Sequence, residues 1–175
     1  ALSGLIGVEG NKNAALPLLA ACLLTDEPCR LTNVPRIRDV GVMIELLESL
    51  GAEINGADSD TLEICCRKVT SAEPDRRLVG RLRGSVLLLG PLLARLGHAR
   101  LAPPGGDFPA RRTISVHLQA LRALGARDVS DDCYELEVPK GLHPASVYLE
   151  EASVTGTETA LLTAAAVEGT TEIRH

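Results

Sequence analysis

A proline- and glycine-rich turn at residues 103–106 is followed by one acid, Asp107, and then by the pair Arg111 and Arg112. A carboxyl group can exchange a proton, and Arg112 can clamp a phosphate or carboxylate through two parallel hydrogen bonds. The alternative is a solvated turn whose local Asp–Arg pair adds little stability. The segment therefore predicts either acid–base chemistry beside a bound anion or a plain connection.

Two more cations stand where apolar helices are expected to begin. Lys12 lies in the stretch Gly-Asn-Lys-Asn-Ala-Ala-Leu-Pro, where we expect Asn13 to be the N-cap and Pro17 to fall in the first turn. Arg83 enters the second apolar helix, where its charge opposes the helix dipole unless an anion lies nearby. Ordinary helix-start chemistry at Lys12 and a surface arginine at Arg83 are the alternatives.

The third apolar helix is entered through Ser153, Val154 and Thr155. Thr155 and Glu158 fit a capping box, in which each side chain bonds a backbone amide of the other's turn. Helix N-termini carry free amides and a positive dipole end. If the three helix starts meet at one end of the lobe, the sequence predicts a strong anion site there.

These residues are carried by an internal repeat. Similar stretches begin at residues 18, 88 and 161, and each reads as an apolar helix, a polar break and a short strand. An amphipathic helix ending in Leu-Gly-Ala follows the first two, at residues 47–54 and 121–128. A third such signature is expected at about residue 190, so we expect the chain to break off inside its third repeat. The pattern predicts an α/β lobe whose central helices are wrapped by sheet and by outer helices.

The two helices of each repeat differ in kind. The first is apolar nearly all round and is expected in the interior, whereas the second has one apolar face. Gly51 and Gly125 occupy the position of a helix C-cap glycine. The expected apolar helices are 14–24, 86–96 and 159–167, and the expected strands are 53–55, 61–66, 133–138 and 146–149.

Composition narrows the function classes. The chain of 175 residues has a net charge of −5 and 2% aromatic residues, which argues against a nucleic-acid surface. Its five cysteines show no CxxC spacing, so we expect free thiols in a reducing compartment. Uncharged runs are too short to span a membrane, and the expected location is cytoplasmic. His98, His117 and His143 are scattered, and we assign them no metal; no dinucleotide or Walker fingerprint is present.

The quoted motifs resemble one family. The stretches at 10–24, 81–97, 104–126, 139–145 and 153–171 are similar, in order, to UDP-N-acetylglucosamine enolpyruvyl transferases (UDP-N-acetylglucosamine 1-carboxyvinyltransferases). The shikimate-pathway enzyme that makes 5-enolpyruvylshikimate 3-phosphate shares the fold but matches these motifs less well. The resemblance implies two lobes, each an inside-out α/β barrel of pseudo-threefold repeats. Residues 1–10 would be a strand belonging to the second lobe, and residues 11–175 the first catalytic lobe, incomplete at its C-terminus.

The resemblance also implies a reaction that needs no cofactor. Enolpyruvate passes from phosphoenolpyruvate to the 3-hydroxyl of UDP-N-acetylglucosamine, phosphate is released, and the sugar nucleotide is committed to peptidoglycan synthesis. Lys12 matches a lysine that contacts phosphoenolpyruvate, and Arg83 and Arg112 match arginines that hold its phosphate and carboxylate. On the sugar nucleotide, Asn13 matches an asparagine that holds the sugar. The stretch that contacts the diphosphate corresponds to Ser153, Val154 and Thr155.

Asp107 occupies the position where most members carry the cysteine that protonates the enolpyruvyl methylene and is alkylated by fosfomycin. The reference pKa of an aspartic acid is about 3.9 against about 8.5 for cysteine. We therefore expect Asp107 to gain its proton only in the closed, substrate-loaded site, and we expect fosfomycin insensitivity because a carboxylate is a weaker nucleophile than a thiolate.

The sequence departs from the family pattern near the acceptor. Thr155 replaces the usual glycine, and Thr113, Ile114 and Ser115 follow the loop arginine where the family shows Pro, any residue and Asp. A paralogue acting on another nucleotide or sugar therefore stays open, as does a catalytically silent anion-binding module. The acid that activates the acceptor hydroxyl lies in the family's second lobe. RNA terminal-phosphate cyclases have related repeats, but the acidic, aromatic-poor composition argues against them.

Overall fold

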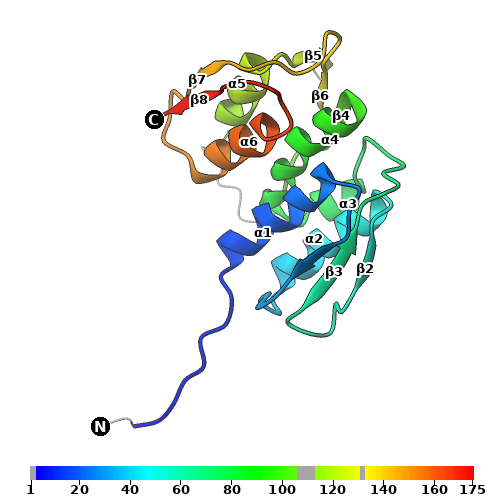
Figure 1. Ribbon diagram of the computed structural model, residues 1–175, viewed down its shortest axis with the longest axis vertical. Helices are drawn as coiled ribbons and strands as arrows, with labels where there is room; N and C mark the ends of the chain where they lie inside the picture. Colours follow the sequence, from blue (N-terminus) through cyan, green and yellow to red (C-terminus); the bar gives the residue numbers. More distant parts are fainter. Residues whose placement is uncertain (1–2, 106–112, 131–132) are drawn as a thin grey trace.

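The computed structural model describes residues 3–105, 113–130 and 133–175 of the chain. Three inner helical segments cross the middle of the molecule (Figure 1). They are α1 (Lys12–Ala21) continued by η1 (Cys22–Leu24), η2 (Arg83–Leu88) followed by α4 (Leu89–Leu96), and α6 (Val154–Ala164). The outer helices are α2 (Arg38–Ser49) and α5 (Ser115–Ala123), and a short helix α3 (Arg76–Val79) precedes η2. Each outer helix packs on an inner one, α2 on α1 and α5 on α6.

Small sheets complete each repeat. The first repeat contains β1 (Cys29–Leu31), β2 (Glu53–Asn55) and β3 (Leu62–Cys65), and the second contains β4 (His98–Leu101), β5 (Arg127–Ser130) and β6 (Tyr134–Glu137). Their strand orders are β1-β3-β2 and β4-β6-β5, antiparallel throughout. In the third repeat β7 (Ser146–Tyr148) pairs in parallel with β8 (Glu172–Arg174). The identical order in the first two sheets confirms the predicted internal repeat.

The predicted strands are present within one residue of their expected bounds. Gly51 and Gly125 have φ angles of 102° and 111°, the left-handed geometry that a C-cap glycine provides. Strand β5 and helix α3 were not among the predicted elements. The third inner helix begins five residues earlier than expected, at Val154, because its cap lies at Ser153.

The inner helices are buried to different degrees. The first five residues of α4 are buried, whereas α1 exposes 52% of Leu18 and α6 exposes 55% of Leu161. The expectation that all three are interior helices is therefore wrong for one side of α1 and of α6. Helices α4 and α6 approach closely, because Gly90 on α4 faces Thr163 on α6 without a side chain between them.

The five cysteines are free thiols. Burial raises the pKa of Cys22 to about 12 and that of Cys66 to about 11, so both remain protonated at neutral pH. Cys22 and Cys66 are core packing residues, in keeping with the sequence prediction.

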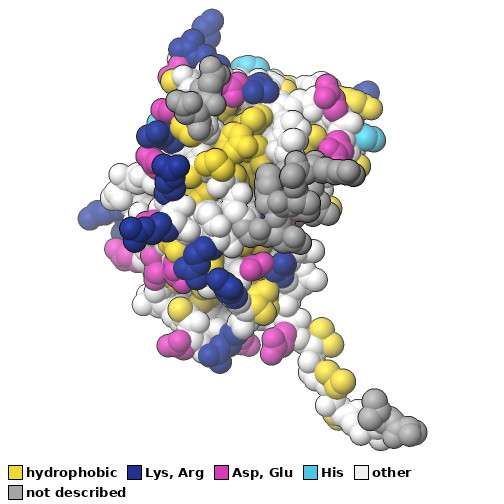
Figure 2. Space-filling view, turned by 180° about the vertical axis from the view of Figure 1, so that it is seen from behind, with side chains coloured by type: hydrophobic (Ala, Val, Ile, Leu, Met, Phe, Trp, Pro, Cys, Tyr) yellow, Lys and Arg dark blue, Asp and Glu magenta, His cyan; other side chains and the backbone are white. Residues whose placement is uncertain are grey.

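The described residues before α1 adopt neither helix nor strand. They extend away from the body of the molecule (Figures 1 and 2), and their apolar side chains Leu5, Ile6 and Val8 are almost completely exposed. In the described part of the chain, no helix combines the length and apolarity that crossing a bilayer requires.

Candidate functional site

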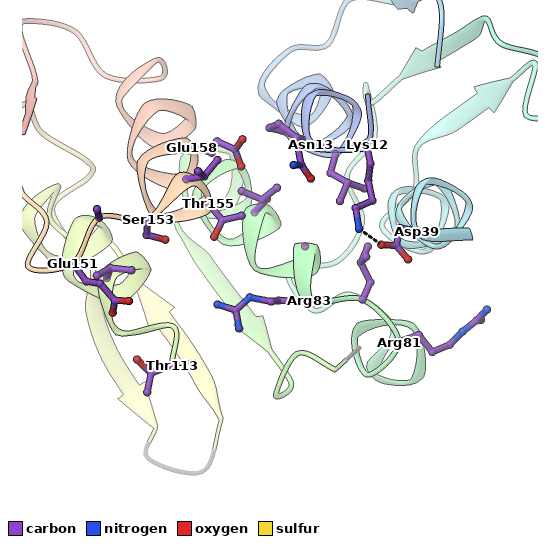
Figure 3. A pocket seen from close by; sticks show the side chains of 18 residues that line it. Lys12, Asn13, Asp39, Arg81, Arg83, Thr113, Glu151, Ser153, Thr155 and Glu158 are labelled. Carbon is purple, nitrogen blue, oxygen red and sulfur yellow. Dashed lines mark hydrogen bonds and ion pairs between the residues drawn. The ribbon is translucent and has the colours of Figure 1, made fainter. Parts of the chain in front are cut away.

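One cavity of about 580 Å³ lies where the inner helices begin. Residues from the starts of α1, η2 and α6 line it together with residues of α2 and the segments before α5 and α6. Six predicted site residues are among them: Lys12, Asn13, Arg83, Ser153, Val154 and Thr155. The structure thus brings the three helix starts to one place, although they are far apart in sequence (Figure 3).

Lys12 is the first residue of α1 and is held by an acid from α2. Its Nζ lies 3.0 Å from Oδ2 of Asp39, and both side chains are partly exposed. At such exposure the pair contributes at most about 1 kcal/mol to stability, so its main consequence is to fix the ammonium at the cavity wall. The N-cap of α1 is Asn11, whose side chain accepts from the Asn13 amide at 2.7 Å. The prediction that Asn13 is the cap is therefore wrong, and Asn13 faces the cavity instead (Figure 3).

Pro17 also departs from its predicted place in the first turn. Since α1 begins at Lys12, Pro17 is the sixth residue of the helix, where its ring removes one backbone hydrogen bond. Pro17 lines the cavity, so a carbonyl of the preceding turn is left without its helical partner close to this wall.

Arg83 begins η2, whose N-cap residue Leu82 makes no side-chain capping bond. Its guanidinium extends toward the first turn of α6, whereas Arg81 points away from the cavity and pairs with Glu45 at 3.5 Å (Figure 3). A cation at a helix start is unfavourable for the dipole, so this position favours a bound anion.

The start of α6 is capped by Ser153, whose Oγ accepts from the Gly156 amide at 3.1 Å. The predicted capping box of Thr155 and Glu158 is therefore wrong. Thr155 instead shares a hydrogen bond with His117, whose Nε2 lies 2.9 Å from Oγ1 of Thr155. Glu158 lines the cavity, and burial raises the pKa of its carboxyl.

Sequence reasoning missed several residues of this site, among them Asp39 and His117. Asp39 carried one usable signal, an acid in the first turn of an amphipathic helix. His117 is completely buried on α5, directly behind the cavity wall formed by Thr155. Burial and the nearby Arg83 lower the pKa of His117 to about 4, so its imidazole is neutral at pH 7.

This lowered pKa predicts a loss of stability on acidification. The ordinary pKa of a histidine is about 6.5. Between pH 6.5 and pH 4, His117 is therefore protonated in the unfolded chain but not in the folded chain. The contribution of His117 to the free energy of unfolding is therefore fully present above pH 6.5. The free energy of unfolding falls by about 3 kcal/mol as the pH drops through this range. Urea unfolding at pH 7 and pH 4.5 should show a steeper loss in the wild type than in His117→Gln. Equal losses in both proteins would contradict the prediction.

Asp107 and Arg112 lie outside the described residues. The flanks of their segment are described. The Gly105 amide donates to the Val79 carbonyl at 3.0 Å, and Thr113 lines the cavity. Among the described residues, no group of three His, Cys, Asp or Glu side chains is arranged to hold a metal ion.

Fold and cavity define a class of protein: a lobe of α/β repeats whose inner helix starts surround a site with lysine and arginine at its wall. A sequence model of the EPSP synthase (3-phosphoshikimate 1-carboxyvinyltransferase) family matches residues 1–175. The chain belongs to this family.

Curated relatives narrow the comparison. UDP-N-acetylglucosamine 1-carboxyvinyltransferases from Bradyrhizobium diazoefficiens and Treponema denticola are 48% and 42% identical, each over 99% of this chain. The chain spans 40% and 41% of those two proteins. The names of these relatives therefore agree with the family that the sequence motifs resemble.

Solved structures agree on the fold. The enolpyruvyl transferase NikO from Streptomyces tendae matches with a TM-score of 0.82 and 26% identity, over 99% of this chain and 41% of that one. EPSP synthase from Acinetobacter baumannii matches with a TM-score of 0.73 and 17% identity, over 96% of this chain and 39% of that one. The second likeness is one of fold alone.

Proposed function

We propose that this chain forms most of one lobe of an enzyme that transfers enolpyruvate from phosphoenolpyruvate to the 3-hydroxyl of UDP-N-acetylglucosamine. The observation that carries the proposal is the cavity at which Lys12, Arg83 and the start of α6 meet. Relatives at 37% to 48% identity bear the name of this activity, which supports the choice of acceptor. The step commits the sugar nucleotide to peptidoglycan synthesis.

In the proposed reaction the acceptor oxygen bonds to C2 of phosphoenolpyruvate while a proton adds to C3. Phosphate then leaves with the electrons of its C–O bond, and loss of a proton from C3 restores the double bond. Lys12, Arg83 and Arg112 neutralise the phosphate and carboxylate, and the charges placed there need no reorganisation during the reaction. Asp107 supplies the proton to C3.

The acceptor is proposed to lie along the α6 side of the cavity. Asn13 would hold the sugar, and Ser153, Val154 and Thr155 the diphosphate, because the first amides of a helix have no intrahelical partners and attract anions. The proton of the acceptor hydroxyl passes to an acid of the second lobe. The substrates are charged metabolites, which is why we place the enzyme in the cytoplasm.

The second lobe and the completion of the third repeat are part of this proposal. Leu18 on α1 and Leu161 on α6 expose apolar surface on neighbouring helices. In the first repeat, the outer helix α2 packs on the inner helix α1. An outer helix of the third repeat would pack in the same way on α6 and would cover Leu18 and Leu161. The exposed residues Leu5, Ile6 and Val8 suit a strand that pairs with the second lobe.

Phosphate release by the complete protein, supplied with phosphoenolpyruvate and UDP-N-acetylglucosamine, tests the proposal. Turnover that depends on this sugar nucleotide supports it. Tight binding of both ligands without turnover would instead indicate a silent anion-binding module. Because this chain spans about 40% of its relatives, the assay requires the complete protein and not the 175-residue piece.

A second candidate is an enolpyruvyl transferase with another nucleotide or sugar as acceptor. Thr113 and Ser115 stand where the resembled family shows Pro and Asp, and their hydroxyl oxygens lie 2.7 Å apart in a hydrogen bond. Of the two, Thr113 lines the cavity. A hydroxyl pair presents different donors and acceptors to a base or sugar than a carboxylate does. Phosphate release with other nucleotides, but not with UDP-N-acetylglucosamine, would favour this candidate.

Fosfomycin should not inactivate the wild-type enzyme, whereas Asp107→Cys should become sensitive. A thiolate attacks the epoxide carbon of the antibiotic, and a carboxylate at the same position is a far weaker nucleophile. Residual phosphate release after incubation with fosfomycin measures the effect, with phosphoenolpyruvate as the protecting ligand. Time-dependent inactivation of the wild type would refute the assignment of Asp107 to this position.

A further inference from the structure

The buried histidine of α5 contacts a residue of the cavity wall. His117 is 0% exposed, and its Nε2 lies 2.9 Å from Oγ1 of Thr155. Its other ring nitrogen, Nδ1, is buried and has no hydrogen-bond partner among the described residues. Thr155 lines the cavity in the first turn of α6. The imidazole therefore lies immediately behind a side chain that faces the cavity.

Close packing of α5 and α6 fixes this arrangement. Gly156 on α6 is buried, and a Cβ at this position would lie 3.1 Å from Cγ2 of Val116 on α5. Glycine thus lets the two helices approach at the residue next to Thr155. The His117 ring is held between them with little freedom to turn.

The charge state of His117 decides what the Thr155 hydroxyl can do. The imidazole is neutral at pH 7, so one ring nitrogen carries a proton and the other does not. The Ile114 backbone raises the pKa of His117, but Nδ1 has no aligned hydrogen-bond partner among the described residues, so a proton on Nδ1 would lack a well-directed acceptor, which is costly. With the proton on Nε2, the ring donates to Thr155 Oγ1, and the hydroxyl proton of Thr155 remains available to an acceptor in the cavity.

We propose that His117 is a positioning residue that turns the hydroxyl of Thr155 toward the diphosphate of the acceptor substrate. This inference rests on the proposed function. The resembled family usually has glycine at the position of Thr155, so the hydroxyl is a donor added to the helix amides. The ligand chemistry that it recognises is an anionic phosphate oxygen, which accepts a strong charge-assisted hydrogen bond.

Kinetics of the complete protein test the role of Thr155. Thr155→Val keeps the shape of the side chain but removes the hydroxyl, and we expect it to raise KM for UDP-N-acetylglucosamine about tenfold. The kcat and the KM for phosphoenolpyruvate should change less than about twofold, because the lost bond is made to the acceptor alone. Thr155→Ser keeps the hydroxyl and should recover most of the affinity for UDP-N-acetylglucosamine that Thr155→Val loses. An unchanged KM in Thr155→Val would overturn the proposal.

A double-mutant cycle tests whether His117 acts through Thr155. His117→Leu should raise the same KM in the wild-type background and add less than about twofold in the Thr155→Val background. Independent effects that multiply would overturn the proposal. His117→Gln, which keeps a donor amide, should recover part of the loss. If His117→Leu fails to fold, His117→Gln takes its place in the cycle, and effects of His117→Gln and Thr155→Val that multiply would overturn the proposal.

A binding measurement separates this inference from the proposed function. If the wild type releases no phosphate with UDP-N-acetylglucosamine, the proposed acceptor is wrong. Titration calorimetry with inorganic pyrophosphate then decides the role of Thr155. We expect about tenfold weaker binding to Thr155→Val than to the wild type, and equal affinities would overturn the inference.

Discussion

Replacing Lys12 by glutamine should reduce the rate of phosphate release by about a hundredfold or more, the scale of losing one preorganised charge from an active site. The side chain stands at the start of α1, and its Nζ is fixed 3.0 Å from Asp39 at the cavity wall. Phosphoenolpyruvate brings a phosphate and a carboxylate to this wall, so the removed charge is one that the reaction uses. The measurement is kcat/KM for phosphoenolpyruvate in the complete enzyme.

Lys140→Gln is the matched control, since it removes the same charge from an exposed position that does not line the cavity. We expect that variant to retain wild-type activity. In Lys12→Gln the Asp39 carboxylate loses its ion-pair partner, and its uncompensated negative charge adds to the loss of anion binding. Equal activity of Lys12→Gln and Lys140→Gln would show that Lys12 lies outside the reaction.

Gly90→Ala should lower the free energy of unfolding by about 2 to 3 kcal/mol, the usual scale of overpacking a filled interior. A Cβ at this position would lie 2.2 Å from Oγ1 of Thr163 and 3.4 Å from the carbonyl oxygen of Thr159. Thr163 cannot swing aside freely, because it is fully buried and its hydroxyl bonds the Thr159 carbonyl at 2.7 Å. Helices α4 and α6 would have to separate. Urea unfolding measures the change.

A glycine-to-alanine substitution elsewhere in the chain should raise the free energy of unfolding instead of lowering it. Gly41 lies within α2, and a Cβ there would meet nothing within 4 Å. Gly41→Ala should therefore stabilise the protein by about 0.5 to 1 kcal/mol, because alanine loses less backbone entropy in a helix. A Gly90→Ala protein as stable as Gly41→Ala would show that α4 and α6 tolerate a wider separation.

Much of the architecture could be predicted because the same local sequence patterns recur in each repeat. Hydrophobic periodicity and the Leu-Gly-Ala signature located the helices and the C-cap glycines Gly51 and Gly125, both in the left-handed region. The meeting of the three helix starts also followed from the repeat, since equivalent elements must lie in equivalent places. Lys12 and Arg83 on one cavity wall are a consequence of that symmetry.

The misses have a common physical origin. Asn11 and Asn13 are equally good caps by type, and only the backbone geometry decides for Asn11. Asp39 and His117 act through contacts with residues 27 and 38 positions away, at Lys12 and Thr155. Local patterns carry no information about such partners. A buried histidine also looks, in one sequence, like any other residue on an apolar helix face.

The sheet order shared by the first two repeats has a kinetic consequence. Each sheet is assembled from strands of a single repeat, β1 to β3 within residues 29–65 and β4 to β6 within residues 98–137. The chain segments that join pairing strands therefore stay within one repeat, and closure entropy grows only slowly with segment length. Sequence separation between pairing strands governs how fast a sheet forms. We therefore expect each repeat to build its own sheet early, and we expect docking of α1, α4 and α6 around the candidate site to be the later event in folding.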